Sequence, residues 1–217
     1  MEEDIQHGGI PDGPERQQEQ IRRIIYQIRR LMQDQGAEPS VDFITLYIDL
    51  LSDPGLMEEA GAQFLTIFED ASDPSLAHHY RAAYSARRRL EQEIAASQTP
   101  TLLALYRAYH QTDHTWESIS GLAVFIRNRQ VKNLCLRLLS RLDTPEIHEM
   151  ITNQFQNTPV ATDRMHAFSL LIASSAPERL ELFREMMERA RKDPVVWEQF
   201  LAATAGSDAD DLVSLIR

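Results

Sequence analysis

Hydrophobic positions recur with the spacing of amphipathic helices along most of this 217-residue chain. Residues three and four apart share one face of an α-helix, so apolar stripes with this spacing predict helices that bury one side. No segment shows the sustained alternation of apolar and polar positions that is typical of strands. We therefore predict an all-α fold. The stripes lie within residues 21–32, 56–68, 76–94, 102–109, 131–142, 147–155, 165–172, 180–190, 196–201 and 212–216.

Prolines mark where many of these helices begin. An aspartate or threonine, which caps helix N-termini well, directly precedes proline at Pro54, Pro74, Pro100, Pro145 and Pro194. Proline has no amide hydrogen to leave unpaired in the first turn, and its fixed φ suits a helix. Pro177, which follows two serines and an alanine, is a looser version of the same pattern. The sequence therefore predicts helix starts at six prolines.

The spacing of the starts predicts the architecture. From Thr144 onward they fall near residues 145, 162, 177, 194 and 208, so that alternate starts lie about 32 residues apart, the length of one helix hairpin. No repeated sequence accompanies this spacing. We expect an irregular array of antiparallel helix hairpins, an α-solenoid or HEAT-like superhelix of about ten helices. Residues 1–14, rich in glycine and proline, are expected to be a flexible lead to a helical domain over residues 15–217.

Composition narrows the function. The chain has a net charge of -11, which argues against nucleic-acid binding through phosphate neutralisation. It has no long apolar run that could span a membrane, and its acidic start is unlike a secretory signal, so we expect a cytoplasmic protein. The one cysteine, Cys135, excludes an internal disulfide framework. Because it lies inside an apolar stripe, we expect a buried structural thiol rather than a nucleophile.

The basic residues are mostly arginines in clusters. Arg22, Arg23, Arg29 and Arg30 lie opposite an isoleucine stripe, which predicts a solvated face with no membrane role. Residues 87–89 are three consecutive arginines. The first of them falls on the apolar face of its helix, and we expect this cluster to pair with the two glutamates that follow it, Glu91 and Glu93.

Paired histidines are the only candidates for a metal site. His110 and His114 are four apart and could hold zinc from one helical face, but Gln111 stands where a zinc peptidase needs a glutamate as general base. A third ligand at the expected distance would be Asn133, which binds zinc poorly. The sequence favours a helix end with solvated histidines, with the metal site as the alternative.

Two further histidine positions have the same structural interpretation. His78 and His79 are adjacent, so their rings point about 100° apart on a helix and do not share a metal easily. His148 and Glu149 lie near a helix start, where we expect one to pack and the other to face solvent. Met186, Met187 and Trp197 lie on apolar stripes and are expected in the core. We therefore predict no catalytic, cofactor-binding or metal-binding residues and no cofactor.

One stretch is more specific than helix composition. Residues 129–139, which contain Lys132 and Asn133, resemble a helix in the C-terminal helical domain of the bacterial alanyl aminopeptidases, the aminopeptidase N family. The similarity continues in order and covers about residues 40–217. Its other pieces are residues 72–74, 102–106, 153–155, 161–164, 193–200 and 202–204.

The resemblance implies a non-catalytic role. In that family a zinc-binding HExxH helix and a Gly-x-Met-Glu-Asn loop belong to an earlier domain, and neither motif occurs in this sequence. His110 and His114 are then not the family's zinc ligands. The family's domain also continues past the point where this chain stops, which is consistent with a fragment or a shortened relative.

Three functions follow in order of preference. The first is a helical domain that packs on a zinc peptidase domain, of the same or a related chain, and helps enclose its substrate chamber. The second is a free-standing α-solenoid that binds another protein. The third is an independent hydrolase that uses His110, His114 and a carboxylate.

Overall fold

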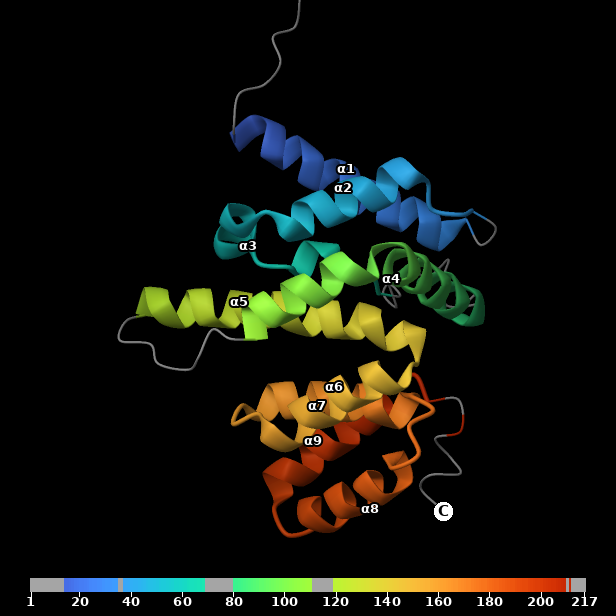
Figure 1. Cartoon of the computed structure of the whole chain (residues 1–217), viewed down its shortest axis with the longest axis vertical. Helices are drawn as coiled ribbons and strands as arrows, with labels where there is room; N and C mark the ends of the chain where they lie inside the picture. The colour runs from blue at the N-terminus through green and yellow to red at the C-terminus, as the bar shows by residue number, and fades with distance from the viewer. Residues whose placement is uncertain (1–13, 35–36, 69–79, 111–118, 210, 212–217) are drawn as a thin grey trace, which may run out of the picture.

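The described residues of the computed structural model form helices and no strand, which confirms the all-α prediction (Figure 1). The structure describes residues 14–34, 37–68, 80–110, 119–209 and 211. Its α-helices are α1 (Pro14–Gln33), α2 (Val41–Ser52), α3 (Pro54–Ala60), α4 (Tyr80–His110), α5 (Ile119–Leu139), α6 (Pro145–Asn157), α7 (Ala161–Ala173), α8 (Arg179–Ala190) and α9 (Pro194–Ala205). Two short 3-10 helices are η1 (Gln63–Leu65) and η2 (Ser140–Leu142).

The helices stack along the long axis of the molecule broadly in chain order, except that α9 lies between α7 and α8 (Figure 1). α1 and α2 form the N-terminal end, α3 to α5 follow, and α6 to α9 form the C-terminal end. Neighbouring helices of each hairpin make the most extensive contacts, above all α4 with α5, α6 with α7, and α8 with α9. This is the array of helix hairpins that the spacing of helix starts predicted.

Three prolines begin helices as predicted. Pro54, Pro145 and Pro194 occupy the first turns of α3, α6 and α9. The Asp53 side chain accepts a hydrogen bond from the Leu56 amide at 3.0 Å, and Asp193 caps α9 in the same way. These caps satisfy amide groups that the helix itself leaves unpaired. Pro177 differs because α8 begins two residues later, and Pro74 lies outside the described residues.

Pro100 begins the second arm of α4. The helix is interrupted at Gln98, where φ is -126° and ψ is 21°, so two helical arms meet at a kink there. Proline suits the first turn of the second arm, because its missing amide hydrogen would have no partner within that arm. The two helices predicted on either side of Thr99 are therefore present as the two arms of α4.

Other boundaries also differ from the prediction. The helix expected through Phe68 ends at Ala60, because Gly61 takes a left-handed φ of 70° and closes the helix with a hydrogen bond to the Met57 carbonyl. The sequence pattern missed α2, although Ser40 caps it by accepting from the Phe43 amide. Residues 207–209, where a last helix was expected to begin, are irregular, and the stripe at 212–216 lies outside the described residues.

The core is one apolar cluster that runs through the stack. The second half of α5 is its most densely buried part. Its leucines are buried on more than one side of the helix, and Cys135 is buried among them, as predicted. Met186 is buried, and Met187 and Trp197 pack against the core from its edge. The main fully buried aromatic side chains are those of Phe43, Tyr47, Phe168 and Phe183.

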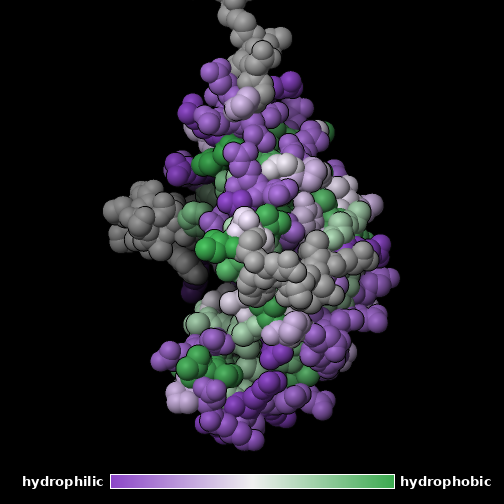
Figure 2. All heavy atoms as spheres, turned by 90° about the vertical axis from the view of Figure 1, so that its left-hand side faces the viewer, coloured by the Kyte–Doolittle hydropathy of each residue, from purple (hydrophilic) through white to green (hydrophobic). Residues whose placement is uncertain are grey.

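The surface is mixed. Arg22, Arg23, Arg29 and Arg30 are exposed on α1, as the stripe opposite them predicted. On the side of the molecule that Figure 2 shows, hydrophilic residues cover most of both ends. Several separate hydrophobic patches interrupt them, most of them near the middle. None of the helices in the described part of the chain is both long and apolar enough to cross a membrane.

Candidate functional site

A cavity of about 720 Å³ lies between the middle of the stack and its C-terminal end. Side chains of α4, α5 and η2 form one wall, and α7, α9 and the segment after α9 form the other. The lining is rich in charged and hydroxyl groups, among them Arg88, Arg137, Ser140, Ser169 and Asp208. Two clusters of ion pairs join the two walls, and they are the candidate functional features of this chain.

The first cluster surrounds Asp163, whose side chain is only 1% exposed. Three residues on one face of α5 donate to its carboxylate. Lys132 Nζ lies 2.6 Å from Oδ2, Asn133 Nδ2 lies 2.9 Å from Oδ1, and Arg129 Nη2 lies 2.7 Å from Oδ1. Because residues three and four apart share a helical face, one helix presents all three donors to one carboxylate of α7.

A second set of contacts extends this cluster. The Gln154 amide donates to Asn133 Oδ1 at 3.0 Å, and the Tyr106 hydroxyl donates to Gln154 Oε1 at 3.3 Å. The His166 Nε2 lies 3.0 Å from the Asn133 carbonyl oxygen. The cluster thus ties α4, α5, α6 and α7 together.

Burial and charge set the protonation states of this cluster. Burial alone would raise the pKa of Asp163, but the hydrogen bonds from Arg129, Lys132 and Asn133 outweigh it and lower that pKa. Burial lowers the pKa of His166 to about 4, so the ring is neutral at pH 7. Burial, with the nearby charge of Asp163, raises the pKa of Tyr106 to about 12.

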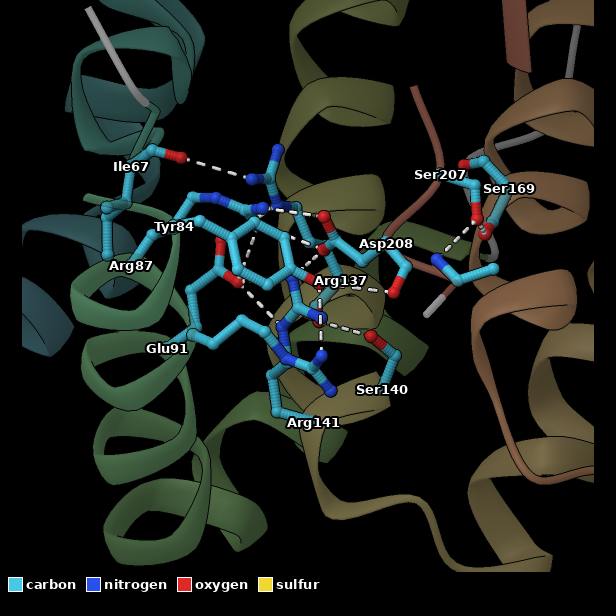
Figure 3. A network of polar contacts seen from close by, with 12 residues as sticks. Ile67, Tyr84, Arg87, Glu91, Arg137, Ser140, Arg141, Ser169, Ser207 and Asp208 are labelled. Atoms are coloured by element: carbon cyan, nitrogen blue, oxygen red, sulfur yellow. Dashed lines mark hydrogen bonds and ion pairs between the residues drawn. The ribbon is translucent and has the colours of Figure 1, made fainter. Parts of the chain in front are cut away.

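The second cluster surrounds Glu91 and Asp208 (Figure 3). Glu91, with a side chain 1% exposed, receives Arg137 Nε at 2.9 Å, Arg141 Nε at 2.6 Å and Arg87 Nη1 at 3.3 Å. α4 supplies Glu91 and Arg87, while α5 and η2 supply the other two arginines. Three guanidinium groups therefore converge on one buried carboxylate.

Asp208 reaches this cluster from the irregular segment after α9. Its Oδ1 lies 2.6 Å from Arg87 Nη2 and its Oδ2 lies 3.0 Å from Arg87 Nη1, and Arg141 also donates to Oδ2. The Tyr84 hydroxyl donates to the Asp208 carbonyl oxygen at 3.2 Å. Burial alone would raise the pKa of Asp208, but these two arginines hold that pKa well below its ordinary value.

The structure confirms the pairing expected for Arg87 with Glu91. No described residue pairs with Glu93, which lies on the exposed side of α4. Lys132 and Arg137 on α5 both pair with carboxylates, and Lys132 is buried.

The histidine and cysteine candidates that lie in the described part of the chain take structural positions. His110 is exposed at the end of α4 and stacks on Tyr106 with ring centroids 5.3 Å apart. His148 packs, with Nε2 2.7 Å from Asp143 Oδ1, and Glu149 faces solvent. His78, His79 and His114 lie outside the described residues. Burial raises the pKa of Cys135 to about 12, which keeps the thiol protonated.

No metal centre emerges from the part of the chain that the structure describes. Its histidines, cysteines, aspartates and glutamates form no group of three or more that could hold a metal ion. The Asn133 side chain, considered above as a third ligand, hydrogen-bonds to Asp163 and Gln154.

Sequence patterns did not identify Arg141, Asp163 or Asp208 as members of a cluster. One available signal was a charged pair, Arg87 and Glu91, on the otherwise apolar face of α4. Another was the set of stretches that carried the family resemblance. Three of those stretches supply Asn133, Gln154 and Asp163, and the structure brings these residues into one hydrogen-bonded cluster.

Comparison with known proteins identifies the family of the chain. A family described as a domain of unknown function, DUF3458_C, with ARM repeats, matches residues 15–217. The chain belongs to this family. Its description as ARM repeats agrees with the array of helix hairpins, and the match covers nearly the whole described part of the chain.

Individual relatives are aminopeptidases. The chain is 26% identical to aminopeptidase N of Escherichia coli strain K12 over 136 residues, which cover 63% of this chain and 15% of that protein. The fold also matches a crystal structure of Legionella pneumophila aminopeptidase A in complex with aspartic acid, with a TM-score of 0.67 and 18% identity. That match covers 92% of this chain and 24% of the other, so this chain spans a small part of the length of either relative.

Proposed function

We propose that this chain is a non-catalytic helical domain that packs on a zinc peptidase domain, of the same or a related chain, and helps enclose its substrate chamber. The observation that carries the proposal is the family match over residues 15–217, together with the identity to aminopeptidase N. We also propose that it works in the cytoplasm and acts through protein contacts rather than nucleic-acid or membrane binding, in keeping with its net charge of -11.

The first half of α5 supports a docking role. Residues 122–126 are consecutive apolar residues, yet no side chain between Ile119 and Gln130 is buried. Ile119 is 88% exposed and Ile126 is 42% exposed. This half of the helix projects sideways beyond α6 and α7 (Figure 1). Apolar surface that a domain leaves accessible often marks an interface, and a peptidase domain is the partner that the family suggests.

A pull-down of the purified chain from its host lysate, with mass spectrometry of the retained proteins, tests the proposal. We expect a zinc peptidase to be retained by the wild-type chain and lost from an Ile119→Asp/Ile126→Asp variant. A Tyr26→Asp/Val195→Asp variant is the matched control, because its two residues are 67% and 62% exposed on other helices. Retention of an unrelated protein instead would favour the free-standing scaffold.

Activity gives a second test. The chain alone should not hydrolyse alanyl substrates, with or without added zinc, because hydrolysis needs a metal-activated water and a general base. Zinc-dependent turnover that is lost in His110→Ala and His114→Ala variants would support the independent hydrolase and contradict the proposal.

A further inference from the structure

Asp208 occupies a pocket that is built for a carboxylate. Arg87 offers both Nη atoms to its two oxygens, which is the two-pronged geometry in which a guanidinium binds a carboxylate best. The side chains of Arg87 and Arg141 are only 5% and 8% exposed. Arginines this buried have lost most of their water, so they favour an anionic partner strongly.

The group that fills this pocket is held less firmly than the pocket itself. Arg87 and Arg141 lie on helical elements, and Glu91 fixes both of them from the other side. Asp208 comes instead from the irregular segment of residues 207–209, more than a hundred residues away in sequence from Arg87. Its side chain is 18% exposed. The other hydrogen bonds of this segment include those from the Ser207 hydroxyl to the Ser169 carbonyl oxygen, from the Ser207 amide to the Thr204 carbonyl oxygen and from the Tyr84 hydroxyl to the Asp208 carbonyl oxygen.

Space continues beyond Asp208. The cavity of about 720 Å³ includes Asp208 in its wall, and Arg88, Arg137 and Ser140 extend its polar lining. The Arg137 side chain is 25% exposed. This volume falls within the range of pockets that hold small molecules or a few residues of a peptide.

We propose that this cavity is a binding site for carboxylate ligands, in which Asp208 is an internal occupant. A small organic acid, or a peptide through its C-terminus or an acidic side chain, places a carboxylate on Arg87 and Arg141 and displaces Asp208. The segment of residues 207–209 then leaves the wall. The inference rests on the geometry of this pocket and does not require a peptidase partner.

Binding of succinate, followed by titration calorimetry at constant ionic strength, tests the site. An internal carboxylate competes at a high effective concentration, so removing it should strengthen succinate binding by about tenfold or more. We therefore expect Asp208→Ala and Asp208→Asn variants to bind succinate more tightly than the wild-type chain. Arg141→Gln should bind more weakly than either, and succinamide should bind none of them.

The two Asp208 variants keep the test decisive. Asp208→Asn preserves the size of the side chain and leaves a neutral hydrogen-bonding group. Its affinity for succinate can therefore be measured if Asp208→Ala does not fold. In the wild-type chain, succinate should increase amide hydrogen exchange at residues 207–209. Unchanged affinity in the folded Asp208 variant, or equal binding by Arg141→Gln, would overturn the proposal.

Two peptides distinguish the source of the carboxylate. One is an acetylated alanine tripeptide with a free C-terminus, and the other is an acetylated Ala-Glu-Ala with a C-terminal amide. Binding of the first alone would assign the site to peptide C-termini, and binding of the second alone to acidic side chains. If neither peptide binds while succinate does, the site takes small organic acids.

Discussion

Asp163 and Asp208 are both carboxylates that bind basic side chains from the opposite wall of the cavity. The surroundings of the two side chains nevertheless differ. The Asp163 side chain is 1% exposed, lies on α7, and receives its donors from a single face of α5. The Asp208 side chain is 18% exposed, lies on an irregular segment, and receives donors from α4 and η2. The first is a fixed joint between two helices, whereas the second joins a segment that can move without breaking a helix.

The largest effect should come from removing the fixed joint. Asp163→Ala leaves Lys132, whose side chain is 8% exposed, without a partner for its charge. Breaking a buried pair by removing one member typically costs about 3–5 kcal/mol, and we expect that loss of unfolding free energy in denaturant melts.

The matched control for this variant replaces both charges. In Lys132→Met/Asp163→Leu no lysine charge stays buried and unpaired, so the loss should be clearly smaller. If Asp163→Ala alone costs less than about 1 kcal/mol, a value typical of exposed pairs, the cluster is not a structural joint.

Truncation of a buried leucine on α5, the helix that carries Lys132, sharpens the comparison. Leu138 is 0% exposed in the second half of α5, and truncation of such a leucine costs about 2–5 kcal/mol. Leu201, 47% exposed on α9, is the control, and Leu201→Ala should change stability by about 0.5 kcal/mol or less. Equal losses in thermal or denaturant melts would mean that the second half of α5 is not central to the core.

The contrast between the two clusters also shows what the sequence could predict. Lys132 and Asn133 stood out as a specific stretch, and helical spacing alone places Arg129 on their face. The partner of this face, Asp163, followed from no spacing rule, because it lies on another helix. The family resemblance pointed to that residue only indirectly, by including it in a matching stretch.

The position of Asp208 in the second cluster could not be predicted from the sequence. Its segment has no helical pattern, and it meets Arg87 across 121 residues of sequence. The same limit applies to element boundaries. Proline with a capping residue marked α3, α6 and α9 correctly, because that signal is local. The same signal at Pro100 marked the second arm of α4, which follows the kink at Gln98, whereas α2 was missed although Ser40 caps it.

Acid should weaken the Asp208 joint in a defined direction. The arginines lower the pKa of Asp208 in the folded chain below the value of about 3.9 for an unfolded aspartate. The stabilisation is therefore complete above about pH 4 and is lost as the pH falls below it. Asp163, whose pKa is also lowered, contributes with the same sign.

The Asp208→Asn variant isolates this contribution. At pH 7 we expect it to lose about 1.5–3 kcal/mol, the range for hydrogen bonds to charged groups, and its stability should fall less steeply than that of the wild-type chain below pH 4. Parallel acid-unfolding curves for the two chains, measured by circular dichroism, would show that Asp208 does not carry this pH dependence.

The smallest effect should come from a polar residue outside both clusters. His110 is exposed at the end of α4, where its ring stacks on Tyr106. Exposed substitutions change stability by about 0.5 kcal/mol or less, and we expect His110→Ala to stay within that range in denaturant melts. Added zinc should leave the melting temperature of both chains unchanged, because ligands stabilise only the state that binds them. A zinc-dependent increase in the wild-type chain that His110→Ala removes would instead reopen the metal site with His114.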